Sequence, residues 1–149
     1  MNLPVILLAV TLAGAGTAGT VETETEATYT DEDLYVLSHI ISAEAGNCGE
    51  EMLKAVGSVV LNRVADKRFP NTIKEVVFQT EPSLQYGPIK DGSYYNEPTE
   101  DALEVAEYLL ENGSQLPADV IYQSNEVLGE YYTEIDPPPG VGSTMYFGK

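Results

Sequence analysis

The sequence has one cysteine, one histidine and no tryptophan in 149 residues. A single cysteine, Cys48, excludes an intrachain disulfide framework and any zinc site built from several cysteines. A single histidine, His39, argues against a histidine-based metal centre and against a Ser-His-Asp triad. We therefore expect the protein to need neither a metal ion nor an organic cofactor.

Basic residues are also scarce, with 7 Lys and Arg against 24 Asp and Glu and a net charge of −17. Nucleic acids are bound largely by neutralising phosphates with Lys and Arg, so this composition argues against a nucleic-acid partner. The same charge disfavours binding to anionic membrane surfaces. With 43% apolar residues, the chain has the length and composition of one domain with a hydrophobic core.

The charge is unevenly distributed along the chain. Residues 22–53 hold 9 acids and no base, residues 54–90 hold 3 acids and 6 bases, and residues 91–149 hold 12 acids and 1 base. The middle segment is thus locally basic. Such a run is either an ordinary solvated surface or an electrostatic attraction site for an anionic ligand.

No apolar run reaches the roughly 20 residues that a membrane-spanning helix needs. Residues 3–13 are apolar and are followed by the small residues of 14–19, a pattern typical of a secretory signal peptide. The alternative is a buried N-terminal strand or helix. We expect a signal peptide over 1–18, an acidic linker over 19–30 and a folded domain over 31–149. The mature protein would then be secreted, without stable membrane insertion.

Hydrophobic periodicity predicts a helix-dominated α+β domain. The expected helices are one that Thr30 caps and that runs to about residue 45, one over 50–64, a short one over 72–78 and one over 98–112. Residues 119–124 and 144–147 have strand character and are expected to pair. On the last long helix we expect Leu103, Ala106, Leu109 and Leu110 to face inward, with Gly113 ending it. We expect Cys48 to be a small packed residue in a turn.

One carboxylate lies on the wrong face of the first predicted helix. At about 100° per residue, Glu44 falls inside the apolar arc of Leu37, Ile40 and Ile41, whereas His39 falls on the opposite, polar face. A carboxyl beside an apolar face should have a raised pKa, as a general acid requires. The alternative is that the helix frays near its end and Glu44 reaches water.

A long segment rich in Gly, Pro, Tyr and Gln follows over 79–97, and long ordered loops are often functional. It contains Tyr86, Tyr94 and Tyr95, which could stack on a sugar ring or simply pack within the loop.

Four motifs in order resemble the cell-wall hydrolase family of the SleB/CwlJ spore-cortex-lytic type. They are LSHIISAEAG (37–46), VVLNRV (59–64), RFPNT (68–72) and the loop QYGPIKDG (85–92). Residues 120–125 resemble an aromatic strand of that family, and the resemblance spans about 33–148. The usual IGNHVF ending is replaced by residues 141–147, which lack its histidine.

The resemblance implies a lysozyme- and lytic-transglycosylase-like fold, and cleavage of the glycan strands of peptidoglycan. It places the catalytic glutamate of the AEA motif at Glu44. A lytic transglycosylase needs only one carboxylate, because the nucleophile belongs to the substrate, whereas ordinary glycosidases use two. By motif and loop position, we expect six residues to bind substrate: Gln85, Tyr86, Asp91, Tyr122, Gln123 and Asn125. We read Asn62 and Arg63 as structural, forming a buried amide contact and an ion pair.

Two alternatives remain open at this point. The first is an N-acetylmuramoyl-L-alanine amidase, although zinc amidases need two histidines and a third ligand. The second is a non-catalytic wall-binding module on a degenerate hydrolase scaffold, which the missing histidine and tryptophan would suit. In each case the expected partner is peptidoglycan, and we expect a monomer.

Overall fold

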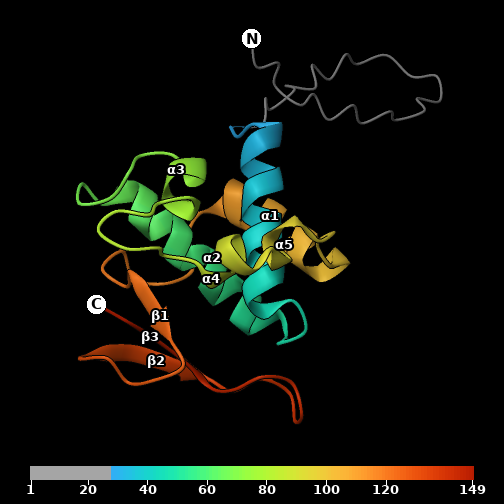
Figure 1. Cartoon of the computed structure of the whole chain (residues 1–149), viewed down its shortest axis with the longest axis vertical. Coiled ribbons are helices and arrows are strands. Elements are labelled where there is room, and N and C mark those ends of the chain that lie inside the picture. The colour runs from blue at the N-terminus through green and yellow to red at the C-terminus, as the bar shows by residue number, and fades with distance from the viewer. Residues whose placement is uncertain (1–27) are drawn as a thin grey trace, which may run out of the picture.

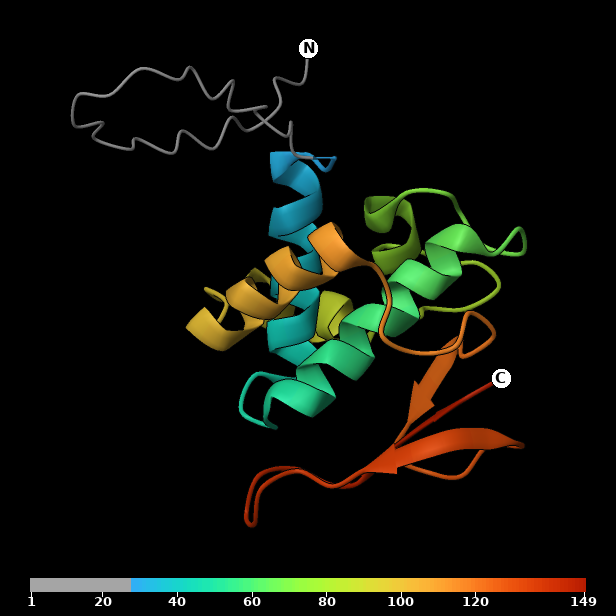
Figure 2. The ribbon, with the colours of Figure 1, turned by 180° about the vertical axis from the view of Figure 1, so that it is seen from behind.

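The computed structural model describes residues 28–149. The predicted signal peptide over 1–18 and most of the linker over 19–30 lie outside the described residues. Three longer helices and three shorter ones form one body, and a small sheet lies against one end of it, beside α2 (Figures 1 and 2). The helices are α1 (Asp31–Ala45), α2 (Glu50–Ala65), α3 (Ile73–Val77), α4 (Gly87–Asp91), the 3₁₀ helix η1 (Ser93–Tyr95) and α5 (Glu100–Asn112).

Local caps determine where the longer helices begin. Thr30 caps α1, because its Oγ1 accepts a hydrogen bond from the Asp33 amide at 3.1 Å and Asp33 accepts one from the Thr30 amide at 3.0 Å. The predicted start of this helix is confirmed. α5 begins two residues later than predicted, because Thr99 is its cap and Pro98 stays outside it. Gly113 ends α5, as predicted.

The core lies where α1, α2 and α5 cross. Gly57 of α2 allows this close approach, because a Cβ built there would lie 2.7 Å from Ile41 Cδ1 and would also collide with Leu109. On α5, the prediction that Leu103 faces inward is wrong, since it is 39% exposed. The buried face instead follows the helical period through Ala102, Val105, Ala106 and Leu109.

The sheet is antiparallel with the strand order β1-β3-β2. The strands are β1 (Tyr122–Ser124), β2 (Tyr131–Ile135) and β3 (Met145–Gly148). β1 pairs with β3 as predicted, with Gln123 opposite Phe147. The sequence reading missed β2, because only Ile135 of its five residues is buried and its pattern therefore lacks a clear apolar face. The predicted α+β class, dominated by helices, is confirmed.

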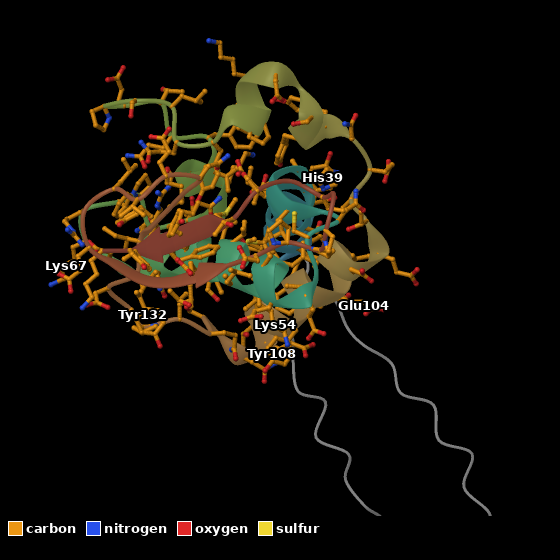
Figure 3. The ribbon with its side chains drawn as sticks, turned by 90° about the horizontal axis from the view of Figure 1, so that it is seen from below. His39, Lys54, Lys67, Glu104, Tyr108 and Tyr132 are labelled. Atoms are coloured by element: carbon orange, nitrogen blue, oxygen red, sulfur yellow. The ribbon has the colours of Figure 1, made fainter. Side chains whose placement is uncertain are left out.

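His39 does not lie on a solvent-exposed face of α1. The side chain of His39, labelled in Figure 3, is only 6% exposed. Its ring stacks on that of Tyr35 with centroids 3.9 Å apart, and the ring centroid of Tyr94 in η1 lies 5.6 Å away. His39 Nδ1 lies 2.7 Å from the Tyr35 carbonyl oxygen. The prediction is wrong because the segment after α4 folds back over this side of α1, which helical periodicity does not reveal.

Candidate active site

Glu44 occupies the last turn of α1 and is half-buried. The helix does not fray before it, because the Gly46 amide still donates to the Ser42 carbonyl at 2.8 Å. Ser42 Oγ in turn accepts a hydrogen bond from the Thr99 amide at 3.0 Å, which ties this turn to the start of α5. The end of α1 is therefore held from two sides, and Glu44 has a fixed backbone position.

Gln123 of β1 reaches Glu44 from the sheet. Its Nε2 donates a hydrogen bond to Glu44 Oε2 at 3.2 Å, across 79 positions of sequence. Its other amide atom, Oε1, is buried and has no partner among the described residues. The structure therefore brings together two of the predicted site residues, one from each half of the fold.

Asn62 fixes the segment that leads into β1. Its Nδ2 donates to the carbonyl oxygens of Pro117 at 2.8 Å and of Val120 at 2.9 Å. The predicted buried amide contact is confirmed. It ties α2 to the chain just before Gln123, and thereby positions the strand that reaches Glu44.

Arg63 is 7% exposed and lies one helical position further along α2. Its Nε donates to the Ile121 carbonyl at 2.6 Å, and its Cζ lies 5.3 Å from the ring centroids of both Phe69 and Tyr86. The predicted ion pair is wrong, because none of the ion pairs within residues 28–149 includes Arg63. Arg63 Nη1 is buried with no partner in that part of the chain.

Tyr86 precedes α4 and is only 2% exposed. The packed loop covers its ring, and its predicted role in substrate binding stays a prediction. Its hydroxyl is buried and makes no hydrogen bond of good geometry within the described chain. Burial raises the pKa of Tyr86 to about 12; the positive charge of Arg63 opposes this shift, the negative charge of Glu44 adds to it, and a hydrogen-bonding contact with the Arg63 side chain opposes it.

Asp91 ends α4 and is exposed. Its Oδ1 accepts hydrogen bonds from the Ser93 hydroxyl at 2.6 Å and from the Ser93 amide at 2.8 Å, and these bonds hold the pKa of Asp91 below its usual range. Asp91 therefore stays ionised near neutral pH. Its negative charge acts on Glu44 from the α4 side.

The pKa of Glu44 is raised from its ordinary value, chiefly because burial disfavours the charged carboxylate. The hydrogen bond from Gln123 opposes the shift, the negative charge of Asp91 adds to it, and the positive charge of Arg63 opposes it. Such a group can hold a proton closer to neutral pH than an exposed glutamate and donate it to a leaving oxygen. The arrangement suits general-acid chemistry.

Tyr122 makes only local contacts in the structure. Its hydroxyl donates to the carbonyl oxygens of Leu128 and, at 2.9 Å, of Glu130, which closes the loop between β1 and β2. This bonding gives Tyr122 a clear structural task. Its predicted role in substrate binding stays a prediction.

Gln85 and Asn125 likewise bond to near neighbours. Gln85 Nε2 donates to the Ser83 carbonyl at 2.8 Å, and Asn125 Nδ2 donates to Ser143 Oγ at 3.3 Å. Neither contact joins them to Glu44. Their predicted substrate contacts also stay predictions.

The locally basic segment is largely paired in the fold. Lys54 pairs with Glu50, Arg68 with Asp66, and Lys74 with Glu32. Arg63 is buried and, within the described chain, makes no ion pair. The remaining two basic residues of the segment, Lys67 and Lys90, have no ion-pair partner among residues 28–149. Lys67 extends at the periphery of the domain, on the side away from His39 in Figure 3. Most of the positive charge of this segment is therefore already paired or buried.

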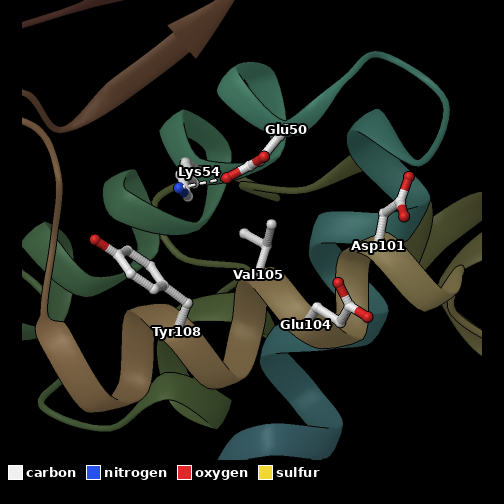
Figure 4. Close-up of a pocket in the computed structure, with 6 residues that line it drawn as sticks. All are labelled: Glu50, Lys54, Asp101, Glu104, Val105 and Tyr108. Carbon is white, nitrogen blue, oxygen red and sulfur yellow. Dashed lines mark ion pairs between the residues drawn. The ribbon is translucent and has the colours of Figure 1, made fainter.

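A separate hollow of about 340 Å³ lies between α2 and α5 (Figure 4). It is lined by Glu50, Lys54, Asp101, Glu104, Val105 and Tyr108. Lys54 lies 4.4 Å from the centroid of the Tyr108 ring and pairs with Glu50, so its charge is already satisfied. None of the predicted site residues lines this hollow.

No group of three or more His, Cys, Asp and Glu side chains gathers as a set of metal ligands among residues 28–149. No described helix combines the length and apolarity needed to cross a bilayer.

Comparison with solved structures identifies the fold. The catalytic domain of the germination-specific lytic transglycosylase SleB from Bacillus anthracis matches with a TM-score of 0.62 at 22% identity, covering 82% of this chain and 98% of that domain. The catalytic domain of the Bacillus cereus SleB protein also matches with a TM-score of 0.62, at 21% identity, covering 89% of this chain and 100% of that domain. The chain shares the fold of these domains.

Curated relatives are longer proteins. The spore cortex-lytic enzyme of Oceanobacillus iheyensis is 26% identical over 113 residues, which cover 76% of this chain and 40% of that protein. The spore cortex-lytic enzyme of Bacillus subtilis is 29% identical over 97 residues, covering 65% of this chain and 30% of that protein. The matched regions span less than half the length of these relatives.

The sequence pattern of the cell wall hydrolase family matches residues 49–135. This region contains Arg63, Tyr86, Asp91 and Gln123, and it begins after Glu44. The resemblance seen in the sequence motifs is thus confirmed over more than half of the molecule, and the chain belongs to the cell wall hydrolase family.

Proposed function

We propose that this protein cleaves the glycan strands of peptidoglycan, with Glu44 as its general acid and base. The observation that carries the proposal is the environment of Glu44, which is half-buried, fixed at a helix end, bonded to Gln123 at 3.2 Å and has a raised pKa. Family membership and the fold shared with SleB catalytic domains support the same substrate class.

The reaction we propose is of the lytic transglycosylase type, at the β-1,4 bond between N-acetylmuramic acid and N-acetylglucosamine. Glu44 donates its proton to the glycosidic oxygen, and the bond from that oxygen to C1 of the muramoyl residue breaks. The muramoyl C6 hydroxyl oxygen then bonds to C1, and its proton passes to the Glu44 carboxylate. This sequence restores Glu44, consumes no water and leaves a 1,6-anhydro end.

Asp91 supports this one-carboxylate scheme by its own chemistry. Its oxygen is engaged with Ser93 and its pKa is lowered, so it is a poor proton donor at neutral pH. Its fixed negative charge instead favours the protonated form of Glu44 and would stabilise a positively charged sugar transition state. Asp91 and Glu44 thus differ in role because their surroundings shift their pKa values in opposite directions.

The test is Glu44→Gln, which keeps the side-chain shape and an oxygen that can accept from Gln123. General acid–base catalysis contributes about 10²–10⁴-fold, so we expect a loss of that order in the rate of muropeptide release. Glu51→Gln makes the same change at an exposed glutamate of α2 and serves as the matched control. Equal rates for Glu44→Gln and the parent protein would refute the role of Glu44.

Mass analysis of the released fragments distinguishes the reaction types. Anhydro ends indicate a transglycosylase, reducing ends indicate hydrolysis, and free stem peptides indicate an amidase. Loss of activity with a chelator would support the amidase alternative. Binding to insoluble wall without any released fragment would support a non-catalytic module.

We also propose that the protein works as a secreted monomer at the cell wall, since this substrate lies outside the cytoplasmic membrane. The apolar run over 3–13 supports export through a signal peptide. Determining the N-terminus of protein recovered outside the cytoplasm tests cleavage near residue 18. Light scattering of the same material tests the monomer.

A further inference from the structure

Three buried polar atoms without a hydrogen bond of good geometry belong to residues that act on Glu44, Gln123 through its hydrogen bond and Arg63 and Tyr86 through charge. They are Arg63 Nη1, Tyr86 Oη and Gln123 Oε1, whereas only one such atom, Gln79 Oε1, is found elsewhere in residues 28–149. Buried polar groups are normally satisfied, so unpaired ones call for an explanation. Arg63 is the one among these residues that carries a full charge, and the structure gives that charge no carboxylate in direct contact.

Resting on the proposed function, we propose that Arg63 is a positioning residue for Glu44. Its guanidinium supplies a permanent positive charge that acts on the carboxyl, and its bond to Ile121 aligns the strand that carries Gln123. Arg63 thereby sets the pH range over which Glu44 remains a proton donor. It touches neither substrate nor the reacting atoms in this role.

The position of the charge is fixed by three contacts. The Arg63 Cζ lies 5.3 Å from each of the Phe69 and Tyr86 ring centroids, and Nε is bonded to the Ile121 carbonyl at 2.6 Å. Arginine suits this site because its planar guanidinium stacks on aromatic rings and remains charged at all relevant pH values. In a water-poor environment such a charge acts on a neighbouring carboxyl, and at Glu44 it follows burial, the Gln123 hydrogen bond and the Asp91 charge in size.

The bond to Ile121 also has a geometric consequence. Ile121 lies two residues before Gln123, and its own amide donates to the Gly148 carbonyl at 2.8 Å. Arg63 therefore anchors the start of β1 while Gly148 anchors it within the sheet. The single side chain both orients the hydrogen-bond donor of Glu44 and supplies a fixed cation that acts on the carboxyl.

The charged and titratable groups facing Glu44 come from two packed elements. α2 contributes Arg63, and the α4 region contributes Asp91 and the Tyr86 hydroxyl.

The other elements against α1 direct their groups elsewhere. Lys74 of α3 pairs with Glu32 near the start of α1, and Tyr94 of η1 packs on His39. α5 meets the end of α1 through Thr99. Arg63 and Asp91 are therefore the opposing charges that act on Glu44.

Because these charges oppose each other, removing one or the other should shift the alkaline limb of the pH–activity profile in opposite directions. We would measure muropeptide release against pH for the parent, Arg63→Gln and Asp91→Asn. We expect the alkaline limb, where Glu44 loses its proton, to move to higher pH in Arg63→Gln. It should move to lower pH in Asp91→Asn, whose amide oxygen can still accept from Ser93.

Two controls separate charge from structure. Arg68→Gln removes one positive charge at an exposed site that pairs with Asp66, and its alkaline limb should coincide with that of the parent. Arg63→Lys keeps the charge but loses the planar stack and the Nε bond, so we expect a lower rate with the limb in place. If Arg63→Gln fails to fold, Arg63→Met is the second uncharged variant, because apolar residues often replace buried charges without loss of stability.

The outcomes are distinct. A reduced rate with an unmoved limb in the uncharged variants would make Arg63 merely structural and overturn the proposal. A limb that moves in Arg63→Lys as far as in Arg63→Gln would overturn it as well. If Glu44→Gln retains the parent's activity, the proposed function itself fails. If Glu44→Gln is inactive while the Arg63 variants leave the limb in place, only the inference about Arg63 fails.

Discussion

Replacing Tyr86 by phenylalanine should make the protein more stable, which is unusual for a change in a buried side chain. The Tyr86 ring is 2% exposed and packs against the Arg63 guanidinium at 5.3 Å. Phenylalanine keeps the ring, its packing and the face that Arg63 covers. The one group removed is a buried hydroxyl that makes no hydrogen bond of good geometry in the described part of the chain, although its contact with the Arg63 side chain lowers its pKa slightly.

The size of the effect follows from the cost of an unsatisfied buried polar group, which is about 1–3 kcal/mol. We therefore expect Tyr86→Phe to raise the free energy of unfolding by about 1–3 kcal/mol. With a urea dependence of about 2 kcal/mol per molar, the unfolding midpoint should rise by roughly 0.5–1.5 M. Far-UV circular dichroism is the suitable signal, because the helices dominate it and the chain has no tryptophan.

Tyr122→Phe supplies the matched contrast, since the same atom is removed from a hydroxyl that does have partners. Tyr122 donates to the Leu128 and Glu130 carbonyl oxygens, so its loss should lower stability by about 0.5–1.5 kcal/mol. If Tyr86→Phe instead lowers the unfolding midpoint as Tyr122→Phe does, the Tyr86 hydroxyl has a partner. The reasoning about unpaired atoms around Glu44 would then be refuted.

Two further predictions concern the core and the acid. Gly57→Ala gains about 1 kcal/mol of helix propensity but forces a methyl group against Ile41 and Leu109, so urea unfolding should show a net loss of roughly 0–2 kcal/mol; a clear gain would contradict the close packing of α1, α2 and α5. The second concerns Glu44, whose pKa is higher in the folded protein than its value of about 4.5 in the unfolded chain. The protonated side chain therefore stabilises the fold at pH values below about 4.5, and this stabilisation is lost as pH rises through the pKa of the folded state. The stability of Glu44→Gln relative to the parent should therefore increase between about pH 4 and about pH 7, and a constant difference in urea midpoints would contradict the burial of the charge.

The helices could be predicted from the sequence because their signals are local. Thr30 and Asp33 lie three positions apart and cap α1 by themselves, and Gly113 ends α5 for a reason confined to its own backbone. On α5, Ala106 and Leu109 were correctly predicted to face inward, but Leu103 was not. Leu103 is as apolar as Leu109, and only packing against α1 and α2 decides which of the two is covered.

Long-range packing also explains the other errors. β2 has no clear alternation of its own and becomes a strand because β3 offers it hydrogen-bonding partners. His39 lies opposite the main apolar arc of α1, but η1, more than fifty positions later, covers it with Tyr94. A periodic pattern indicates which face of a helix is apolar, and it does not indicate how many faces other segments will bury.

The candidate site likewise contains residues that the sequence could identify and residues whose surroundings it could not predict. Glu44 could be selected from the sequence because a carboxylate in an apolar arc is a local anomaly, and Gln123 because it lies in a motif. Arg63 was misread, since a basic residue in a basic segment gives no sign that its charge will be buried. Tyr86 was correctly predicted to lie near Glu44, but its ring is buried and not exposed. Loop composition does not distinguish an aromatic ring on the wall of a groove from one packed beneath that wall.

Burying Glu44 and its polar neighbours lowers the stability of the fold. Natural domains have a free energy of unfolding of only about 5–15 kcal/mol, and unpaired polar atoms near a desolvated carboxylate reduce it. The fully buried crossing of α1, α2 and α5 offsets this loss, and Asn62 and Arg63 use the rigidity of α2 to hold the sheet in register with the end of α1. Of 24 acidic residues, Glu44 is thus distinguished by what surrounds it. If stability and reactivity oppose each other here, substitutions that satisfy or remove the unpaired atoms should stabilise the protein while displacing its pH range of activity.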